Sequence, residues 1–397
     1  MNTEPAGIVA EFDPFHRGHG WLLSRVREAQ GEAPIVVAMS GRFTQRGEAA
    51  CLSPRYRSEM ALLCGADLVL ELPLTWAISS AQGFAAGGIA VLRAAGVRRV
   101  YCGSECADLS LLQSAANALK APEYPELLRQ GLGEGISFAA ARQQAVQALA
   151  GAAPAAVLEQ PNDLLAVSYL EAMGEDMELV PVPRQGSAHN APVAQAGFAS
   201  ASLVRSLLLS GEREQALSLV PEAAQNVLRR ALEAGEAPAS LQYAERAVLA
   251  RLRQMDPMDF AALPGCSEGL EHRLHRAARQ AVSLDSFYET ARSRRYPLSR
   301  IRRLALWAFL GLERRDVRET LPYLRLLGMN DRGRGVLRDM NAKGLRVLST
   351  PGAGKQLSRE EQRYLALETR AADLWQLCLP KPGACGSLWR DNAIVMK

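Results

Sequence analysis

The sequence has no excess of charge of one sign. Its 397 residues include 46 Lys and Arg against 42 Asp and Glu, which gives a formal net charge of +4. The charge of the whole chain therefore does not mark it as a nucleic-acid binder, and such a role has to be sought in local clusters. The length is sufficient for two domains, each with a substantial core.

Cysteines are too scattered for a disulfide framework. The seven cysteines lie at positions 51, 64, 102, 106, 266, 378 and 385. An odd number of cysteines spread over a long chain indicates reduced thiols, which are typical of the cytosol. The first residues, Met-Asn-Thr-Glu-Pro, also lack the basic segment of a secretory signal. We therefore expect a cytoplasmic protein.

One uncharged run, Leu72 to Leu92, reaches the length of a membrane-spanning helix. It is interrupted by Pro73, by three glycines and by several polar side chains, which makes it a poor spanning helix. We interpret it as a strand end, a loop and a tightly packed buried helix. We expect no association with a membrane.

Short apolar runs alternate with helical stretches over the first half of the chain. The predicted strands are residues 7–12, 35–39, 67–72, 98–102 and 178–183. The predicted helices are residues 21–30, 54–64, 139–149 and 162–173. This alternation predicts an α/β fold with a parallel sheet.

Two histidines follow the first predicted strand, in the stretch Asp13-Pro-Phe-His-Arg-Gly-His19. Gly18 lets the backbone turn tightly, so that His16 and His19 reach the same helix N-terminus, where unpaired N–H groups attract phosphate. Ligands of an open parallel sheet gather outside the strand C-termini, so the turn at Gly103 should face the same crevice. We therefore predict a nucleotide site in which the imidazoles stabilise charge on the α-phosphate as pyrophosphate leaves.

Further motifs accompany this histidine pair. They are Glu11 to His19, Met39 to Glu48, Leu70 to Pro73, Gly103 to Glu105 and Pro161 to Leu164. Together they resemble the tRNA(Met) cytidine acetate ligase (TmcAL) family of the HxGH nucleotidyltransferase superfamily. The resemblance covers most of the chain.

The resemblance implies an ATP-dependent ligase that acts on RNA. Acetate would be activated to acetyl-adenylate with release of diphosphate. The acetyl group would then pass to the wobble cytidine of elongator tRNA(Met), giving N4-acetylcytidine and AMP. The implied small molecules are acetate and ATP, the latter with Mg2+, and coenzyme A is not required.

The resemblance also implies roles for particular residues. His16 and His19 would be catalytic. Residues implied to bind ATP are Gly7, Glu11, Phe12, Asp13, Pro14, Phe15, His16, Gly18, His19, Gly20, Gly103, Asn162, Arg184, Gln185, Ser202 and Arg205. Asp13 departs from the family pattern, in which an asparagine is expected.

Several of these residues have simpler interpretations. Asn162 or Asp163 can be an ordinary cap of the helix that it opens. Ser200 and Ser202 can also cap a helix, whereas the resemblance favours contact of Ser202 and Arg205 with phosphate. Gln45, Arg46 and Glu48 could close on acetate or on the target base, or they could belong to a mobile surface loop.

From about residue 211 the composition shifts to Ala, Leu, Glu and Arg at helical spacing. We expect a Rossmann-like HxGH nucleotidyltransferase domain in residues 1–212 and a mostly α-helical domain in residues 213–397. Residues 292–303 contain six arginines and no acid, which suits a phosphate backbone but also a solvated helix face. The predicted tRNA contacts are Arg294, Arg295, Arg300 and Arg303, with Tyr296 stacking on an unpaired base.

Two other functions agree with parts of the sequence. A small-molecule adenylyltransferase would use the same histidines, and a non-catalytic RNA-binding protein would use the basic segment. His272 with His275 and Cys102 with Cys106 lack a clear third and fourth ligand, so Mg2+ on ATP is the metal that we expect. The sequence does not predict an oligomeric state.

Overall fold

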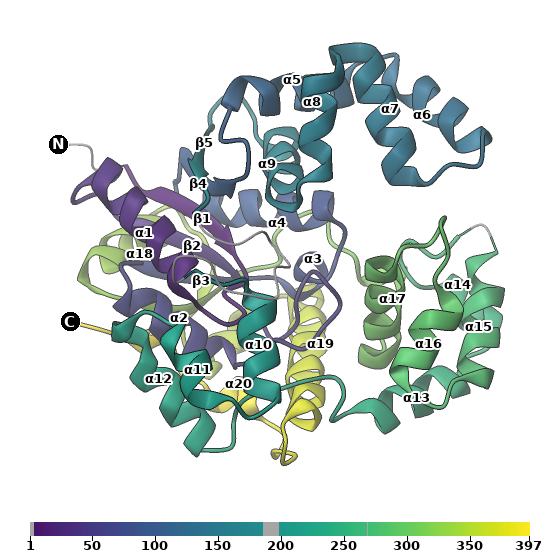
Figure 1. The fold of residues 1–397 in the computed structure, drawn as a ribbon. Helices are drawn as coiled ribbons and strands as arrows, with labels where there is room; N and C mark the ends of the chain where they lie inside the picture. Colours follow the sequence, from purple (N-terminus) through teal and green to yellow (C-terminus); the bar gives the residue numbers. More distant parts are fainter. Residues whose placement is uncertain (1–3, 186–197, 268) are drawn as a thin grey trace.

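The computed structural model describes residues 4–185, 198–267 and 269–397 (Figure 1). In this part of the chain, eight strands form one sheet in the order β5-β4-β1-β2-β3-β6-β7, with β8 paired to β6. The strands are β1 (Ala6–Ala10), β2 (Ile35–Ser40), β3 (Leu68–Leu72), β4 (Arg99–Ser104), β5 (Glu178–Pro183), β6 (Leu324–Met329), β7 (Val347–Leu348) and β8 (Ile394–Val395).

Strands β1 to β5 pair in parallel, which confirms the predicted α/β fold. The strand β5 has the predicted bounds, and the other predicted strands are found within two residues of theirs. Strand β6 is an addition that the sequence pattern does not indicate. It comes from the C-terminal half and pairs antiparallel with β3, so both halves of the chain contribute to one sheet.

Helices cover both faces of the sheet (Figure 1). The helices up to residue 172 are α1 (Arg17–Gln30), α2 (Pro54–Leu63), α3 (Leu74–Ala77), α4 (Ala81–Ala94), α5 (Leu109–Lys120), α6 (Tyr124–Gly133), α7 (Phe138–Ala150), α8 (Ala152–Ala156) and α9 (Pro161–Ala172). The next are α10 (Ala201–Leu209), α11 (Arg213–Ser218), α12 (Glu222–Glu233), α13 (Glu245–Gln254), α14 (Pro257–Ala261), α15 (Leu270–Gln280), α16 (Leu284–Ala291) and α17 (Leu298–Leu310). The last are α18 (Asp331–Ala342), α19 (Arg359–Trp375) and α20 (Ser387–Arg390).

Alternating side chains of the strands give the sheet two separate cores. Val37 of β2 and Val69 of β3 pack with α1, α2, α10, α11 and α12, while Val36 and Leu68 pack with α4, α5 and α9 on the other face. This follows from the period of two along a strand. Both faces are apolar because both are covered by helices, as is usual for parallel strands.

The uncharged run from residue 72 to 92 forms the end of β3 and the buried helix α4, as predicted, with the short helix α3 where a loop was expected. Gly87 and Gly88 of α4 are needed for close packing, because an added Cβ would lie 2.6 Å from Trp76 and 2.6 Å from Val9, respectively. No helix in the described ranges is both long enough and apolar enough to cross a membrane.

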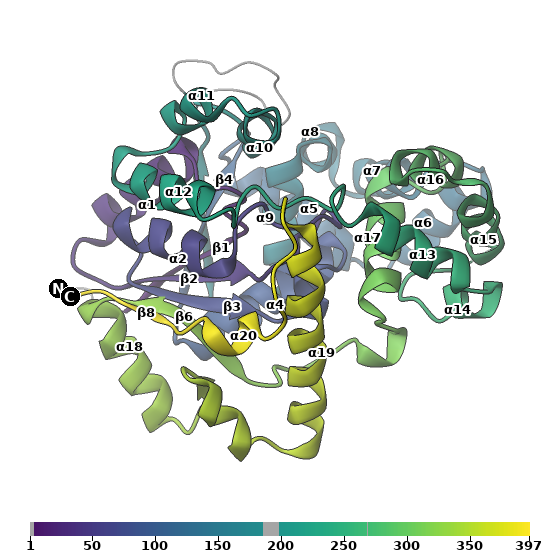
Figure 2. The ribbon, with the colours of Figure 1, turned by 90° about the horizontal axis from the view of Figure 1, so that it is seen from below.

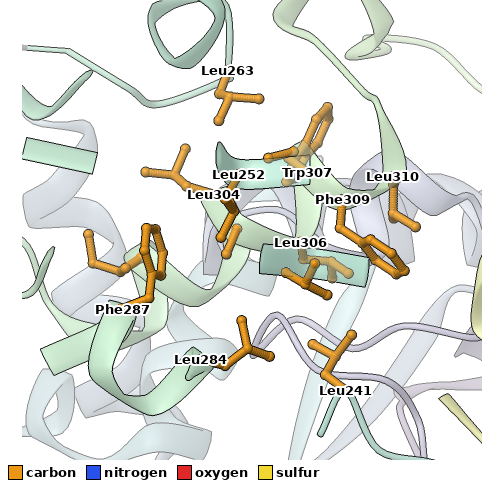
Figure 3. Close-up of a cluster of buried hydrophobic side chains, with 14 of the residues drawn as sticks. Leu241, Leu252, Leu263, Leu284, Phe287, Leu304, Leu306, Trp307, Phe309 and Leu310 are labelled. Atoms are coloured by element: carbon orange, nitrogen blue, oxygen red, sulfur yellow. The ribbon is translucent and has the colours of Figure 1, made fainter. Parts of the chain in front are cut away.

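Helices α13 to α17 form a lobe beside the sheet, shown in green in Figure 1. The core of this lobe is a cluster of buried apolar side chains, among them Leu252, Phe287 and Trp307 (Figure 3). Figure 2 shows α19 between this lobe and the sheet. The indole N–H of Trp307 donates to the carbonyl oxygen of Ile78 at 3.1 Å, and that of Trp375 donates to Ala50 at 3.0 Å. The lobe is therefore packed against the sheet domain.

The strand order places a topological switch at β1. The chain crosses from β1 to β2 on one side and later to β4 on the other, so the crossover helices leave the C-terminal ends of β1 and β4 open. Ligands of open α/β sheets bind at such a point. The turn after Phe12 and the turn after Gly103 both lie there.

Candidate active site

The predicted histidine pair is found at the N-terminus of α1. After β1 the chain turns sharply at Phe12, whose φ is 50°, and His16 is the N-cap of α1. Nδ1 of His16 accepts a hydrogen bond from the Gly18 N–H at 3.0 Å, and Nδ1 of His19 accepts one from the His16 N–H at 3.3 Å. A Cβ at Gly18 would lie 2.9 Å from Cε1 of His16, so only glycine lets the ring fold back over its own turn.

These bonds decide which nitrogen of each neutral ring carries the proton. Because Nδ1 is an acceptor in both rings, the proton sits on Nε2, which becomes a donor. The two rings stack with centroids 3.8 Å apart, and Phe12 and Phe15 pack against His19 at 4.9 and 5.5 Å. The pair therefore offers oriented N–H groups beside the positive end of the helix, which suits an oxyanion such as phosphate.

A cavity of about 610 Å³ opens at the histidine pair, within the size range of sites for small molecules and cofactors. Its walls come from the C-terminal ends of β1, β4 and β5, the first turns of α1, α9 and α10, the loop at residues 44–46, and the start of α17. The cavity thus lies where the strand order predicts a ligand, and the lobe closes one side of it.

Most of the residues implied to bind ATP line this cavity. They are Glu11, Phe12, Asp13, His16, Gly18, His19, Gly103, Asn162, Arg184, Gln185, Ser202 and Arg205. Gly7, Pro14, Phe15 and Gly20 do not line it. Gly7 and Gly20 instead permit close packing, because an added Cβ would lie 2.7 Å from Val97 and 3.1 Å from Pro221, respectively.

The N-terminus of α9 is capped from outside the helix, so the prediction that Asn162 or Asp163 caps it was wrong. The N-cap position is Gln160, whose side chain makes no capping bond. The carboxylate of Glu105 accepts from the backbone N–H groups of Asn162 at 3.1 Å and Asp163 at 3.0 Å. Asp163 in turn accepts from the N–H groups of Glu105 and Cys106 at 2.9 and 3.1 Å. This exchange holds the turn after β4 against α9 at the cavity wall.

The start of α10 is tied to the turn after β1. Ser200 caps α10 by accepting from the Leu203 N–H at 3.2 Å. Arg205 donates to the carbonyl oxygen of Asp13 at 2.5 Å and lies 3.4 Å from its carboxylate. It also lies 3.9 Å from Glu48. Arg205 is thus held in place by the acid at position 13 and faces the cavity.

The loop at residues 41–50 is packed against both the site and the lobe. The Gln45 N–H donates to Oε1 of Glu11 at 2.7 Å, and Glu48 pairs with Arg302 at 2.6 Å. Gly47 has a φ of 77°, and a Cβ there would lie 2.5 Å from the backbone nitrogen of Arg303. These contacts contradict the alternative of a mobile surface loop.

Burial raises the pKa of the Glu11 carboxyl. Loss of solvation raises the pKa of Glu11 to about 7, against the lowering effect of the Gln45 N–H, and the charge of Asp13 raises it further. Arg46 and Arg205 act in the opposite direction. Glu11 therefore exchanges a proton near neutral pH.

The basic segment divides into three parts. Arg294 and Arg295 are exposed. Arg300 donates to the carbonyl oxygen of Gly265 and lies over the ring of Tyr296. Tyr296 is 8% exposed and belongs to the lobe core, which is at odds with stacking on an unpaired base. Arg303 lines the cavity, whereas the basic run in the sequence predicts its contact with the RNA backbone.

Sequence reasoning missed several other residues of the cavity. Arg302 belongs to the same basic run as Arg303, so its charge was visible, but its place in the cavity wall was not. Trp21, Phe84 and Tyr169 supply apolar wall. Trp21 lies two residues after the second histidine, which is the one signal that could have pointed to it.

Three comparisons with known proteins bear on this site. A family model described as HIGH Nucleotidyl Transferase matches residues 3–385. The chain is 33% identical over 397 residues to a tRNA(Met) cytidine acetate ligase from Syntrophomonas wolfei, with 95% of each chain covered. It is 35% identical over 350 residues to the one from Thermotoga maritima, which covers 84% of this chain and 83% of that relative.

Two crystal structures of Thermotoga maritima TmcAL have the same fold as this chain. The apo structure matches with a TM-score of 0.92, and the structure bound with alpha-thio ATP matches with a TM-score of 0.91. Each is 30% identical, and the match covers 99% of both chains.

Proposed function

Because this chain belongs to the HIGH nucleotidyltransferase family, and within it to the tRNA(Met) cytidine acetate ligases, we propose that it joins acetate to a cytidine of tRNA(Met) with ATP. The product is N4-acetylcytidine at the wobble position of the elongator tRNA. The reaction releases AMP and diphosphate.

The observation that carries the proposal is the oriented pair of imidazoles at the N-terminus of α1. A carboxylate oxygen of acetate attacks the α-phosphorus of ATP, and the bond from that phosphorus to the pyrophosphate oxygen breaks. Negative charge on the α-phosphate oxygens is stabilised by the Nε2–H groups of His16 and His19 and by the helix end. The chain supplies no nucleophile in this step, so positioning and charge stabilisation account for the rate.

ATP occupies the cavity of about 610 Å³ in this proposal. Its phosphates face the histidines, and Gly103, Asn162, Arg184, Gln185, Ser202 and Arg205 hold the nucleotide. Mg2+ enters on the phosphates. Mg2+ commonly binds through substrate phosphates and keeps several waters. It therefore does not require a cluster of three or more His, Cys, Asp or Glu side chains, and the described residues contain no such cluster.

The tRNA approaches from the side of the lobe. Arg294 and Arg295 are exposed next to α17, whose first turn forms part of the cavity wall. A backbone held there brings an unstacked wobble base toward the acetyl-adenylate. In this assignment residues 1–212 carry most of the nucleotide chemistry, residues 213–397 carry RNA recognition and add Arg302 and Arg303 to the cavity wall, and the enzyme works in the cytoplasm.

The deciding experiment is exchange of labelled pyrophosphate into ATP, with and without acetate and with and without tRNA(Met). Acetate-dependent exchange, followed by detection of N4-acetylcytidine by mass spectrometry of digested tRNA, is the expected result. Exchange that requires a phosphorylated small molecule instead of acetate would indicate an adenylyltransferase. Binding of tRNA without any exchange would indicate an RNA-binding protein without turnover.

A further inference from the structure

We propose that Glu11 accepts the proton that the cytidine amine loses during acetyl transfer, an inference that rests on the function proposed above. Transfer of acetyl to the exocyclic nitrogen leaves an extra proton on that nitrogen. A base in the cavity wall is needed to remove it, and the histidines are poorly suited because both Nδ1 atoms already accept backbone N–H groups.

Among the described residues, the two acids that line the cavity are Glu11 and Asp13. Asp13 is engaged in structure, since it accepts from the Cys51 N–H at 2.6 Å and pairs with Arg205 at 3.4 Å. Glu11 accepts a single hydrogen bond in the described part of the chain, from the Gln45 N–H to Oε1. None of the ion pairs found there involves Glu11, so Oε2 has no partner among the described residues and can take a proton.

The groups around Glu11 come from every neighbouring element. Asp13 and the histidine pair follow in the same turn, and Arg46 lies on the adjoining loop. Arg57 of α2 donates to the backbone carbonyl oxygen of Glu11 at 2.6 Å. Tyr169 of α9 and Arg205 of α10 also interact electrostatically with the Glu11 carboxylate. Because burial outweighs the arginines, the pKa of Glu11 is raised to about 7, which suits a base that works at neutral pH.

The proposed step is balanced. The exocyclic nitrogen of cytidine forms a bond to the acetyl carbon, and the bond from that carbon to the phosphate oxygen of the adenylate breaks. AMP leaves with the electron pair, and the proton from nitrogen passes to Glu11. Departure of pyrophosphate beforehand removes negative charge from the cavity, which lowers the pKa of Glu11 relative to the ATP complex. Glu11 is therefore more fully ionised when the amine arrives.

The test supplies the enzyme with synthetic acetyl-adenylate and saturating tRNA(Met), so that adenylation is bypassed. Formation of N4-acetylcytidine in a single turnover is followed between about pH 5.5 and pH 8.5, a range that brackets a group titrating near neutrality. The variant is Glu11→Gln, which keeps the size of the side chain and an acceptor for the Gln45 N–H. The matched control is Glu28→Gln, on the exposed face of α1. Acetate-dependent pyrophosphate exchange is measured on the same preparations.

We expect the rate of transfer by the unaltered enzyme to rise with pH and level off above about pH 7. Glu11→Gln should transfer about 100-fold more slowly, without this rise, and its transfer should fall by a clearly larger factor than its pyrophosphate exchange. An unchanged pH profile in the variant would overturn the proposal. Equal loss of exchange and transfer would also overturn it and would assign Glu11 to ATP binding. Failure of the unaltered enzyme to acetylate tRNA from either acetyl donor would refute the proposed function itself.

Discussion

The guanidinium of Arg303 reaches from α17 to the backbone carbonyl oxygen of Gln45, with 3.4 Å between Nη1 and that oxygen. In the described part of the chain no carboxylate pairs with Arg303, whereas its neighbour Arg302 pairs with Glu48. Burial, with a smaller effect of Arg300, lowers the pKa of Arg303 to about 10, so it is charged at neutral pH. A charged group in a cavity wall without a counter-ion favours an anionic ligand.

Replacing Arg303 by alanine should therefore weaken acetate-dependent pyrophosphate exchange even when no RNA is present. A charge-assisted hydrogen bond contributes about 1.5–3 kcal/mol, so we expect kcat/KM for acetate or ATP to fall by about 10-fold or more. Arg315→Ala, at an exposed position that pairs with Glu313 and does not line the cavity, is the control. Normal exchange together with weaker tRNA binding would return Arg303 to the RNA-binding role that the sequence predicts.

Replacing His16 by alanine should lower the rate of pyrophosphate exchange by about 100- to 1,000-fold, because an oriented donor to the α-phosphate is lost. The same change removes the N-cap of α1, which costs about 1 kcal/mol of stability. His16→Asn keeps a capping acceptor and should regain the thermal stability but not the exchange. Exchange by His16→Asn near the normal rate would show that the imidazole acts only as a cap.

The double change Arg294→Ala with Arg295→Ala should weaken binding of tRNA and leave exchange without RNA intact. Each lost phosphate contact should reduce the slope of log affinity against log salt by about 0.7 to 0.9. Filter binding at several salt concentrations measures this slope. Arg230→Ala, on α12 and paired with Glu59, removes one positive charge elsewhere and should leave the slope unchanged. A similar loss in that variant would point to a diffuse charge effect.

Gly47→Ala should separate the loop from α17. The left-handed φ costs an alanine about 1–2 kcal/mol, and the new Cβ would meet the backbone of Arg303 at 2.5 Å. Gly235→Ala is the matched control, because its φ of 71° carries the same conformational cost while nothing lies within 4 Å of an added Cβ. Thermal unfolding should show a greater loss for Gly47→Ala, accompanied by slower exchange. Equal losses in both variants would mean that the contact with α17 is unimportant.

Glu368 of α19 should make stability depend on pH. It is buried, accepts from the Tyr323 hydroxyl at 2.6 Å, and burial, with a further effect of Glu71, raises its pKa from 4.5 to about 7. The folded protein thus holds a proton that the unfolded chain releases, so this contribution to stability is present below about pH 4.5 and is lost as pH rises through about 7. Urea unfolding at several pH values should show a smaller fall for Glu368→Gln. Parallel curves for the two proteins would contradict this.

The sequence predicted the parts of the fold that depend on local pattern. The first five strands follow from apolar runs, and the His16 to His19 turn follows from the residue types at one strand end. The cap of α9 was mispredicted because Glu105 lies 57 residues away in sequence from Asn162, and spacing near a helix start cannot show such a partner. That Arg303 lines the cavity could not be predicted for the same reason, since only packing of the lobe brings α17 to the cavity. Its contact with tRNA stays a prediction.

The pairing of β6 with β3 bears on how the protein is made. Until residues 324–329 have left the ribosome, the edge of β3 has no partner on that side, although four of the five residues of β3 are apolar. An unpaired apolar edge is a template for wrong pairing with another chain. The edge of β3 is therefore open to wrong pairing from the synthesis of residue 72 until the synthesis of β6. Protection of this edge during translation, by chaperones or by ordered release of the C-terminal half, would favour correct folding.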